Sequence, residues 1–440
     1  MVFVELKGVV TRILGRDSFT CTLHDGTRAT EFTSRQFVQP GESVRVACNS
    51  EERAGKAVLV AERVEKIPDM YAEVESRLCE SAQLREIVPF DAAVEALMPD
   101  FKTVAGKLQA AQQLGRYITV KFHGDADGVC SALILRKFLR ANYMQQNSAI
   151  YAVGDAIRDM ERMTQHFRPL LVLLDFGSGQ DSAEGVRLAK AAGIEILSID
   201  HHPPGAAPGP VKGVNPWNVP GIEDGSKYPA GFLCSALASL LGTDSGGLEK
   251  IACAGDKSSI IPVSKQDRER ALALDFVASY SGFGNGIDFY AEVLANTELF
   301  DSILLQANSK LEEADLLIRG AIKSRRAGKA EVYWLNLDSI AEKKEFPNRG
   351  KITSRAFELV NNPEKPIAVI GYSKRTLVFR FNDAAVSAGI RADAIIRAMK
   401  GNFSDFVDNG GGHARAAALR IAEGFESAAI EEIIKIIAQL

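Results

Sequence analysis

The stretch HGDADGVCSALIL, residues 123–135, directly follows the apolar run YITVKF of residues 117–122. The run is hydrophobic on both faces, as is typical of a strand inside a parallel sheet, and the small and aliphatic residues after it predict a helix. His123, Asp125 and Asp127 therefore lie where a buried strand gives way to a helix. Because functional groups collect at the carboxyl ends of strands in such sheets, this junction is a candidate site.

The same pattern recurs twice further along the chain. The apolar run of LLVLLDFGSG ends on Asp175, and that of EILSIDHH ends on Asp200, His201 and His202. Strands that alternate with helices in this way predict an α/β fold with a parallel sheet covered on two sides. The three polar junctions are then expected at one edge of that sheet.

The sequence between the first two junctions gives two further expectations. We predict one helix over GVCSALILRKFLRANYM, residues 128–144, and a buried strand over AIYAVG, residues 149–154.

So many carboxylates at one edge would create an unfavourable cluster of negative charge unless cations were bound there. A mixed histidine and carboxylate set suits Mn²⁺ or Mg²⁺, and the number of acids is sufficient for two ions, which would activate water and hold a phosphoryl group. The alternative, loop and helix-cap chemistry, is a reasonable explanation of Asp127 taken alone. It is a poor explanation of the whole set, because the chain has six histidines and three of them lie at these strand ends.

The first 66 residues have a different sequence pattern. They contain five predicted short strands separated by turns, and Asp25-Gly26 is typical of a hairpin turn. This pattern predicts a small closed barrel similar to an oligonucleotide-binding (OB) fold. Phe19, Phe32 and Phe37 are candidates for base stacking, with core packing expected for at least one of them. The predicted divisions of the chain are a barrel over 1–66, a helical connector over 67–115, the parallel-sheet domain over 116–245, a helical segment over 246–328 and a second α/β domain over 329–440.

Composition limits the possible function classes. The 440 residues are 46% hydrophobic and 25% charged, with a net charge of −4, which gives no overall attraction to nucleic acid or to an anionic membrane. The six cysteines include no CxxC pair, so neither a zinc ribbon nor a disulfide framework is indicated. With no leader-like or membrane-spanning pattern, we expect a cytoplasmic protein that does not bind membranes.

The motifs HGDADG, LLDFGSG and SIDHHPP resemble the first three motifs of the DHH phosphoesterase superfamily, and GGGHARAAA at residues 410–418 resembles the signature of its companion DHHA1 domain. The similarity runs from about residue 105 to the end of the chain. It implies a phosphodiesterase with two divalent cations, Mn²⁺ first and Mg²⁺ as the alternative, between the DHH and DHHA1 domains. The barrel before the DHH domain is most similar to archaeal RecJ-like nucleases, with the trimeric Hef-associated nuclease type as a narrower alternative.

The resemblance assigns roles to individual residues. Asp175 would bridge the two ions, Asp200 would orient a histidine, and His202 would contact the scissile phosphate. A fourth motif in ACAGDKSSIIP would supply Asp256. The implied metal ligands are His123, Asp125, Asp127, Asp175, His201 and Asp256.

The C-terminal motif implies a substrate site. Three consecutive glycines allow backbone amides to approach an anion, and we expect HARAAAL to begin a helix whose N-terminus favours phosphate. Arg391 in VSAGIRAD would face the phosphodiester, although its spacing from Ser387 is longer than in the family. The implied substrate-binding residues are Arg391, Gly410, Gly411, Gly412 and His413.

The resulting hypothesis is an exonuclease acting on single-stranded DNA or RNA in repair, replication or RNA turnover. Expected partners are single-stranded nucleic acid, a helicase or replisome component, and other copies of the chain in a dimer or trimer. Two alternatives stay open: an oligoribonuclease or nucleotide phosphatase acting on short substrates, and a non-catalytic replication scaffold.

Overall fold

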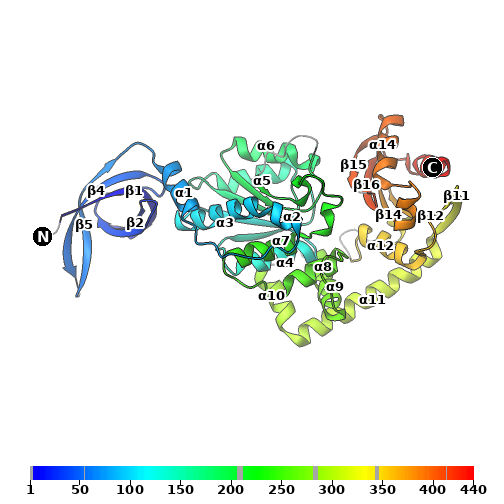
Figure 1. Ribbon diagram of the computed structural model, residues 1–440, viewed down its shortest axis with the longest axis horizontal. Coiled ribbons are helices and arrows are strands. Elements are labelled where there is room, and N and C mark those ends of the chain that lie inside the picture. The colour runs from blue at the N-terminus through cyan, green and yellow to red at the C-terminus, as the bar shows by residue number, and fades with distance from the viewer. Residues whose placement is uncertain (1–2, 54, 206–211, 281–285, 342–345, 413) are drawn as a thin grey trace. The chain divides into compact units, whose positions relative to one another are not determined.

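The computed structural model describes residues 3–53, 55–205, 212–280, 286–341, 346–412 and 414–440 (Figure 1). The chain divides into two compact units. The first comprises Met1–Ala271 with Gly284–Ala291, and the second comprises Leu272–Phe283 with Glu292–Leu440.

The N-terminal residues form a closed five-stranded barrel with the strand order β1-β2-β3-β5-β4. The Asp25 side chain accepts hydrogen bonds from the backbone of Thr27 and Arg28, which closes the predicted hairpin turn. Phe32 is buried in the barrel core, whereas Phe37 is exposed and packs edge-on against Phe19. The OB-like barrel is therefore confirmed, with strands β1 Phe3–Leu14, β2 Phe19–His24, β3 Ala29–Ser34, β4 Ser43–Arg53 and β5 Lys56–Lys66.

Helices follow the barrel, as expected, but they are interrupted. Val74 and Leu78 are buried on the first helix. The predicted helical connector over 67–115 is not continuous, because residues 81–90 are irregular. Asp91 then caps a new helix by accepting the backbone N–H groups of its first turn. These helices are α1 Tyr71–Glu80, α2 Ala92–Ala96 and α3 Met98–Gln113.

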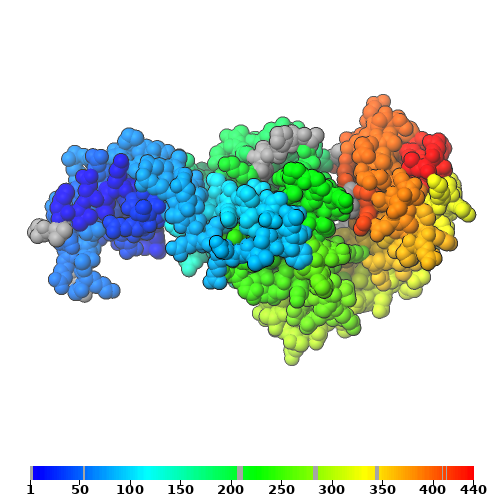
Figure 2. Space-filling view, viewed as in Figure 1, coloured from blue at the N-terminus to red at the C-terminus, as the bar shows by residue number. Residues whose placement is uncertain are grey.

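A five-stranded sheet forms the centre of the first unit, with the order β10-β9-β8-β6-β7 and every pair parallel. Helices α5 and α6 cover one face, and α3, α4 and α7 cover the other (Figure 1). In the space-filling view these helices hide most of the sheet (Figure 2). The strands are β6 Ile118–His123, β7 Asn142–Gln146, β8 Leu170–Leu174, β9 Glu195–Ile199 and β10 Lys212–Val214; the helices are α4 Ala126–Arg136, α5 Val153–Met163, α6 Ala183–Ala191, α7 Ala230–Leu240 and α8 Leu248–Gly255.

Two local predictions in this region are wrong. The helix predicted over residues 128–144 ends at Arg136, and the next strand is β7 rather than AIYAVG. In AIYAVG only Tyr151 is buried, and its hydroxyl donates to Asp159. Ile150 and Val153 are exposed, and Val153 already begins α5, so this apolar run is not a buried strand.

The second unit contains a six-stranded mixed sheet with the order β11-β12-β13-β14-β16-β15. Helices α14 and α15 pack on one hydrophobic cluster of the unit, and α11 and α12 pack on another. This confirms the C-terminal α/β architecture. The strands are β11 Lys323–Ala327, β12 Ala330–Asn336, β13 Ile367–Ser373, β14 Thr376–Phe381, β15 Val407–Gly412 and β16 Ala416–Ile421; the helices are α11 Thr297–Ala321, α12 Arg349–Val360, α13 Asp383–Ser387, α14 Ala392–Asn402 and α15 Glu426–Gln439. Two further helices, α9 Lys265–Tyr280 and α10 Ile287–Ala295, have residues in both units.

Within the described ranges, no helix combines the length and the apolar composition needed to cross a membrane.

Candidate metal centre

The predicted metal ligands of the first unit come from four places in the chain, which are the carboxyl ends of β6, β8 and β9 and the end of α8. His123 is the last residue of β6, and Asp125 caps α4 by accepting the backbone N–H of Gly128 at 3.0 Å. Gly128 cannot carry a side chain, because a Cβ there would lie 2.3 Å from the carbonyl oxygen of His123. This close turn holds the polar side chains of the first motif at the end of the strand.

The fourth junction is the end of α8, where Asp256 is the C-cap residue. It follows Gly255, whose missing side chain allows α8 to pack against the start of α4: a Cβ on Gly255 would lie 2.9 Å from that of Ala126. The glycine in ACAGD therefore brings Asp256 to the first motif.

The ligand atoms form three groups, and within each group they lie within 4.8 Å of one another. Asp175 belongs to two groups and His201 belongs to two, so the three groups are connected. The groups are Asp175, His201 and His202; His123, Asp125 and Asp175; and Asp127, His201 and Asp256.

Asp175 has the features expected of a ligand shared by two ions. It is 2% exposed and has a positive φ of 63°, a left-handed backbone conformation that few residues adopt outside functional sites. Its Oδ2 lies 3.2 Å from His123 Nδ1, and its Oδ1 lies 3.2 Å from His201 Nε2. Within the described part of the chain, this buried Oδ1 accepts no hydrogen bond. Such an oxygen is costly unless a cation or proton satisfies it.

His201 faces the acids with the ring nitrogen that a metal would use. Its Nδ1 lies 2.9 Å from the carbonyl oxygen of Ser226, to which it donates in the neutral ring. Its Nε2 then presents a lone pair to Asp175 and Asp256, each 3.2 Å away. Metal-bound histidines usually donate their second ring N–H to an oxygen in this way, so the donor set fits a divalent cation.

The pKa values show how strongly these groups interact. Burial, together with the charge of Asp175, raises the pKa of Asp127 well above its usual value, and burial raises that of Asp256 to about 7. Burial alone would also raise the pKa of Asp175, but the His123 and His201 rings hold it far below the usual range. Burial alone would lower the pKa of His201, but the neighbouring carboxylates raise it well above normal. Without metal, the cluster therefore retains protons that cations would displace.

Asp200 supports the neighbouring histidines. It is fully buried, and its Oδ1 lies 2.8 Å from His202 Nδ1 while also accepting the backbone N–H groups of His201 and His202. Its Oδ2 accepts the backbone N–H of Ser178 at 2.9 Å. These bonds fix the His202 ring, whose side chain is 42% exposed and accessible to a substrate.

The comparisons with known proteins agree with this geometry. Residues 117–227 match the family model described as "DHH family, N-terminal domain". This protein contains a DHH domain. The predicted resemblance to the DHH superfamily is confirmed over residues 117–227, and this segment includes every predicted metal ligand except Asp256.

Relatives of the whole chain are more distant. The chain is 26% identical to the uncharacterized protein MJ1198 of Methanocaldococcus jannaschii, over 99% of this chain and 68% of the relative. A solved structure described as the DHH domain of PF0399, a member of a family of ribosomal proteins, has a TM-score of 0.73 at 21% identity and covers 84% of this chain and 98% of its own. RecJ of Thermus thermophilus in complex with Mn²⁺ has a TM-score of 0.51 at 18% identity, over 83% of this chain and 59% of RecJ. These structural likenesses concern the fold.

The predicted substrate residues lie in the second unit. Arg391 precedes α14 and pairs with Asp393 at 3.1 Å, with its side chain 47% exposed. The helix predicted after the triple glycine is wrong, because residues 416–421 form strand β16, paired with the glycines of β15. His413 lies outside the described residues. Substrate binding by Arg391 and by Gly410, Gly411 and Gly412 stays a prediction.

Packing also explains two of these glycines. A Cβ on Gly410 would lie 2.7 Å from the Leu419 side chain, and one on Gly412 would lie 2.4 Å from the carbonyl oxygen of Ala416. Gly412 also has a φ of 139°. The hairpin therefore requires glycine at both positions whether or not an anion binds there.

The sequence did not identify several residues that hold the polar side chains of the candidate metal centre in place. Both oxygens of Asp127 accept backbone N–H groups, from Ala230 and Gly231 at the start of α7, at 2.7 Å each. Asn215 donates to the carbonyl oxygen of His202, and Trp217 donates to that of His201. Most of these contacts use backbone atoms, which have no residue-specific signal in the sequence.

Proposed function

We propose that this protein is a divalent-metal-dependent phosphodiesterase that acts as an exonuclease on single-stranded DNA or RNA. The observation that carries the proposal is the buried Asp175 carboxylate, whose two oxygens face two different groups of ligands. The DHH family match and the RecJ-like fold support a phosphoesterase or nuclease type of function.

The residues would divide between two cations. His123 and Asp125 would hold one, Asp127, His201 and Asp256 would hold the other, and Asp175 would bind both. Imidazole and carboxylate ligands suit Mn²⁺, and the RecJ structure with the similar fold was solved with Mn²⁺. When bound, such ions lower the pKa of water toward neutrality and offset the charge of a phosphoryl group.

His202 would act on the substrate rather than on the metals. Burial would lower its pKa, but the charge of Asp200 raises it, which favours the imidazolium form. With Nδ1–H donated to Asp200, the protonated ring has Nε2–H available for a phosphate oxygen. Asp200 would keep the ring in this orientation and balance its charge.

The N-terminal barrel is the reason for proposing a polynucleotide substrate. Strands β3 and β5 pair at a single position, Thr33 with Val60, and a groove of about 500 Å³ lies beside this pair. Polar side chains line much of it, including Ser18, Arg35 and Gln36. OB folds use grooves of this kind, with exposed aromatic side chains such as Phe37, to bind single strands.

The test is a product ladder from end-labelled single-stranded DNA and RNA of graded length, with Mn²⁺ and with EDTA. We expect progressive shortening of long strands that EDTA abolishes. Undiminished digestion in EDTA would contradict the metal-dependent mechanism. Activity confined to the shortest oligonucleotides would favour the oligoribonuclease alternative.

A further inference from the structure

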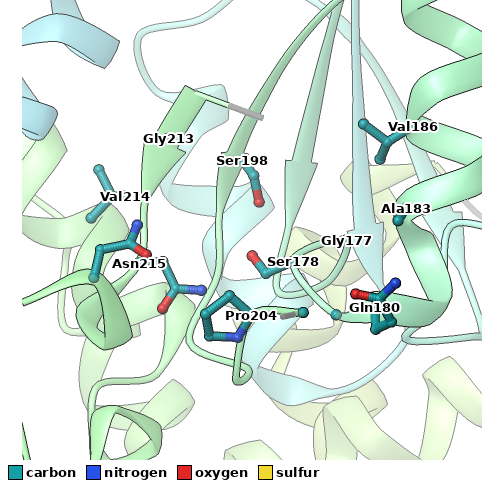
Figure 3. A pocket seen from close by; sticks show the side chains of 13 residues that line it. Gly177, Ser178, Gln180, Ala183, Val186, Ser198, Pro204, Gly213, Val214 and Asn215 are labelled. Carbon is teal, nitrogen blue, oxygen red and sulfur yellow. The ribbon is translucent and has the colours of Figure 1, made fainter. Parts of the chain in front are cut away.

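A separate cavity of about 90 Å³ lies on the α6 side of the sheet, beside the ends of β8, β9 and β10 (Figure 3). Its walls come from the loop after β8, the start of α6, and the segments around β9 and β10. None of the predicted metal ligands lines it. Its lining residues include Ser178, Gln180, Ala183, Ser198, Gly213 and Asn215.

Ser198 is a polar residue in an otherwise apolar row. Alternation along β9 places it on the same face as Ile196, which packs into the hydrophobic cluster under α5 and α6. It is 5% exposed, and its Oγ has no hydrogen-bond partner within the described residues. The hydroxyl points into the cavity (Figure 3). A buried hydroxyl without a partner indicates a ligand that would provide one.

The cavity is neutral. Its lining residues include no Asp, Glu, Lys, Arg or His, so a phosphate or another charged group would be poorly stabilised there. Gln180 and the Ser198 hydroxyl instead provide both donor and acceptor groups. Gly213 has no room for a side chain, since a Cβ there would lie 1.9 Å from the carbonyl oxygen of Ser198. These features suit a small, uncharged, planar ring with polar edges.

The cavity walls are hydrogen-bonded to His202, which would meet the phosphate, and to Asp200, which would orient it. Ser178 donates its backbone N–H to Asp200, and Asn215 donates its side-chain amide to the carbonyl oxygen of His202. Ser198 precedes Asp200 by two residues, roughly 7 Å along an extended strand. A sugar ring could bridge that separation.

We propose that this cavity binds the base of the nucleotide whose phosphate lies at the metal centre, an inference that rests on the proposed function. Its volume equals that of about three water molecules, which is close to the size of one pyrimidine ring. The site would thus recognise a nucleoside through a neutral pocket and the phosphate through the metals.

The first test uses uncharged nucleosides, so that it does not depend on catalysis. Thymidine and adenosine are titrated against the full chain, and the dissociation constants are measured by NMR. Ala183→Leu adds three carbon atoms to a lining residue and should weaken thymidine binding at least about tenfold. Ala191→Leu, at the exposed end of the same helix, is the matched control and should bind as the wild type does.

Ser198→Ala separates an effect on nucleoside binding from an effect on the stability of the fold. Loss of one hydrogen bond should weaken thymidine binding about fivefold. Because the hydroxyl has no partner among the described residues, the melting temperature should not fall. Unchanged binding in both Ser198→Ala and Ala183→Leu, or no nucleoside binding by the wild type, would overturn the proposal.

The second test links the pocket to catalysis. The kcat/KM for thymidine 5′-(p-nitrophenyl phosphate) is divided by that for methyl p-nitrophenyl phosphate, a diester without a base. The ratio should fall at least about tenfold in Ala183→Leu and stay at the wild-type value in Ala191→Leu. An unchanged ratio in Ala183→Leu would contradict base binding during turnover. If the wild type hydrolyses neither ester, the proposed function fails, whereas nucleoside titration still decides whether the pocket binds a base.

Discussion

The parallel sheet of the first unit and the mixed sheet of the second place charged side chains in opposite ways. In the first, parallel strands end at one edge, so His123, Asp175 and His201 converge from distant parts of the sequence. In the second, Arg391 and Asp393 are an example of charged side chains that pair with a close neighbour in the sequence. Topology alone concentrates unbalanced charge at the first site, and this difference identifies it as the candidate metal centre.

The largest expected effect comes from removing the charge shared by both groups of ligands. Asp175→Asn keeps the size of the side chain but should lower kcat about a thousandfold or more, since metal stabilisation is worth several kcal/mol. Initial rates on end-labelled single-stranded DNA measure the effect, and circular dichroism checks the fold. Activity within about tenfold of wild type would show that Asp175 is not the shared ligand.

Asp256→Asn should be less severe, because Asp256 belongs to one group of ligands only. We expect a loss of about a hundredfold, partly restored by a higher Mn²⁺ concentration. The matched control is Asp301→Asn, an exposed acid on α11, which should keep wild-type activity. Equal activities of the two variants would remove Asp256 from the site.

Asp200→Asn tests whether Asp200 orients the histidines and does not itself bind metal. Loss of the Asp200 carboxylate should lower kcat by about 10- to 100-fold, as expected for a residue that orients a functional side chain, while elemental analysis finds unchanged metal content. A loss of metal together with activity would instead make Asp200 a ligand.

The smallest effect is expected in the second unit. Arg391→Ala should raise KM about threefold with little change in kcat, and an exposed ion pair contributes less than about 1 kcal/mol to the free energy of unfolding. Arg397 pairs with the same acid, Asp393, so Arg397→Ala is the matched control. Identical KM values for both variants and the wild type would remove Arg391 from the substrate site.

The two sheets also differ in how well the sequence predicted them. The DHH strands β6, β8 and β9 are buried on both faces, so their apolar runs and the polar residues after them were distinct. Strand β7 was missed because it lies at the edge of the sheet and its sequence, NYMQQ, is polar. An edge strand lacks the continuous burial that produces a recognisable run.

The error at the glycine-rich hairpin had another cause. The alanines after Gly412 have high helix propensity, but Ala417, Leu419 and Ile421 are buried in alternation with exposed residues. That period of two is the strand signal, and pairing with β14 and β15 outweighs the local preference. The partners of Asp127 could not be predicted at all, because they are backbone N–H groups more than 100 residues away.

Asp175 is proposed to connect two cation sites. Titration of metal-depleted protein with Mn²⁺, followed by electron paramagnetic resonance, tests this connection. We expect two Mn²⁺ ions per chain with a spectrum of two coupled ions, and loss of that coupling in Asp175→Asn. A single bound Mn²⁺, or two ions in the wild type without coupling, would contradict it.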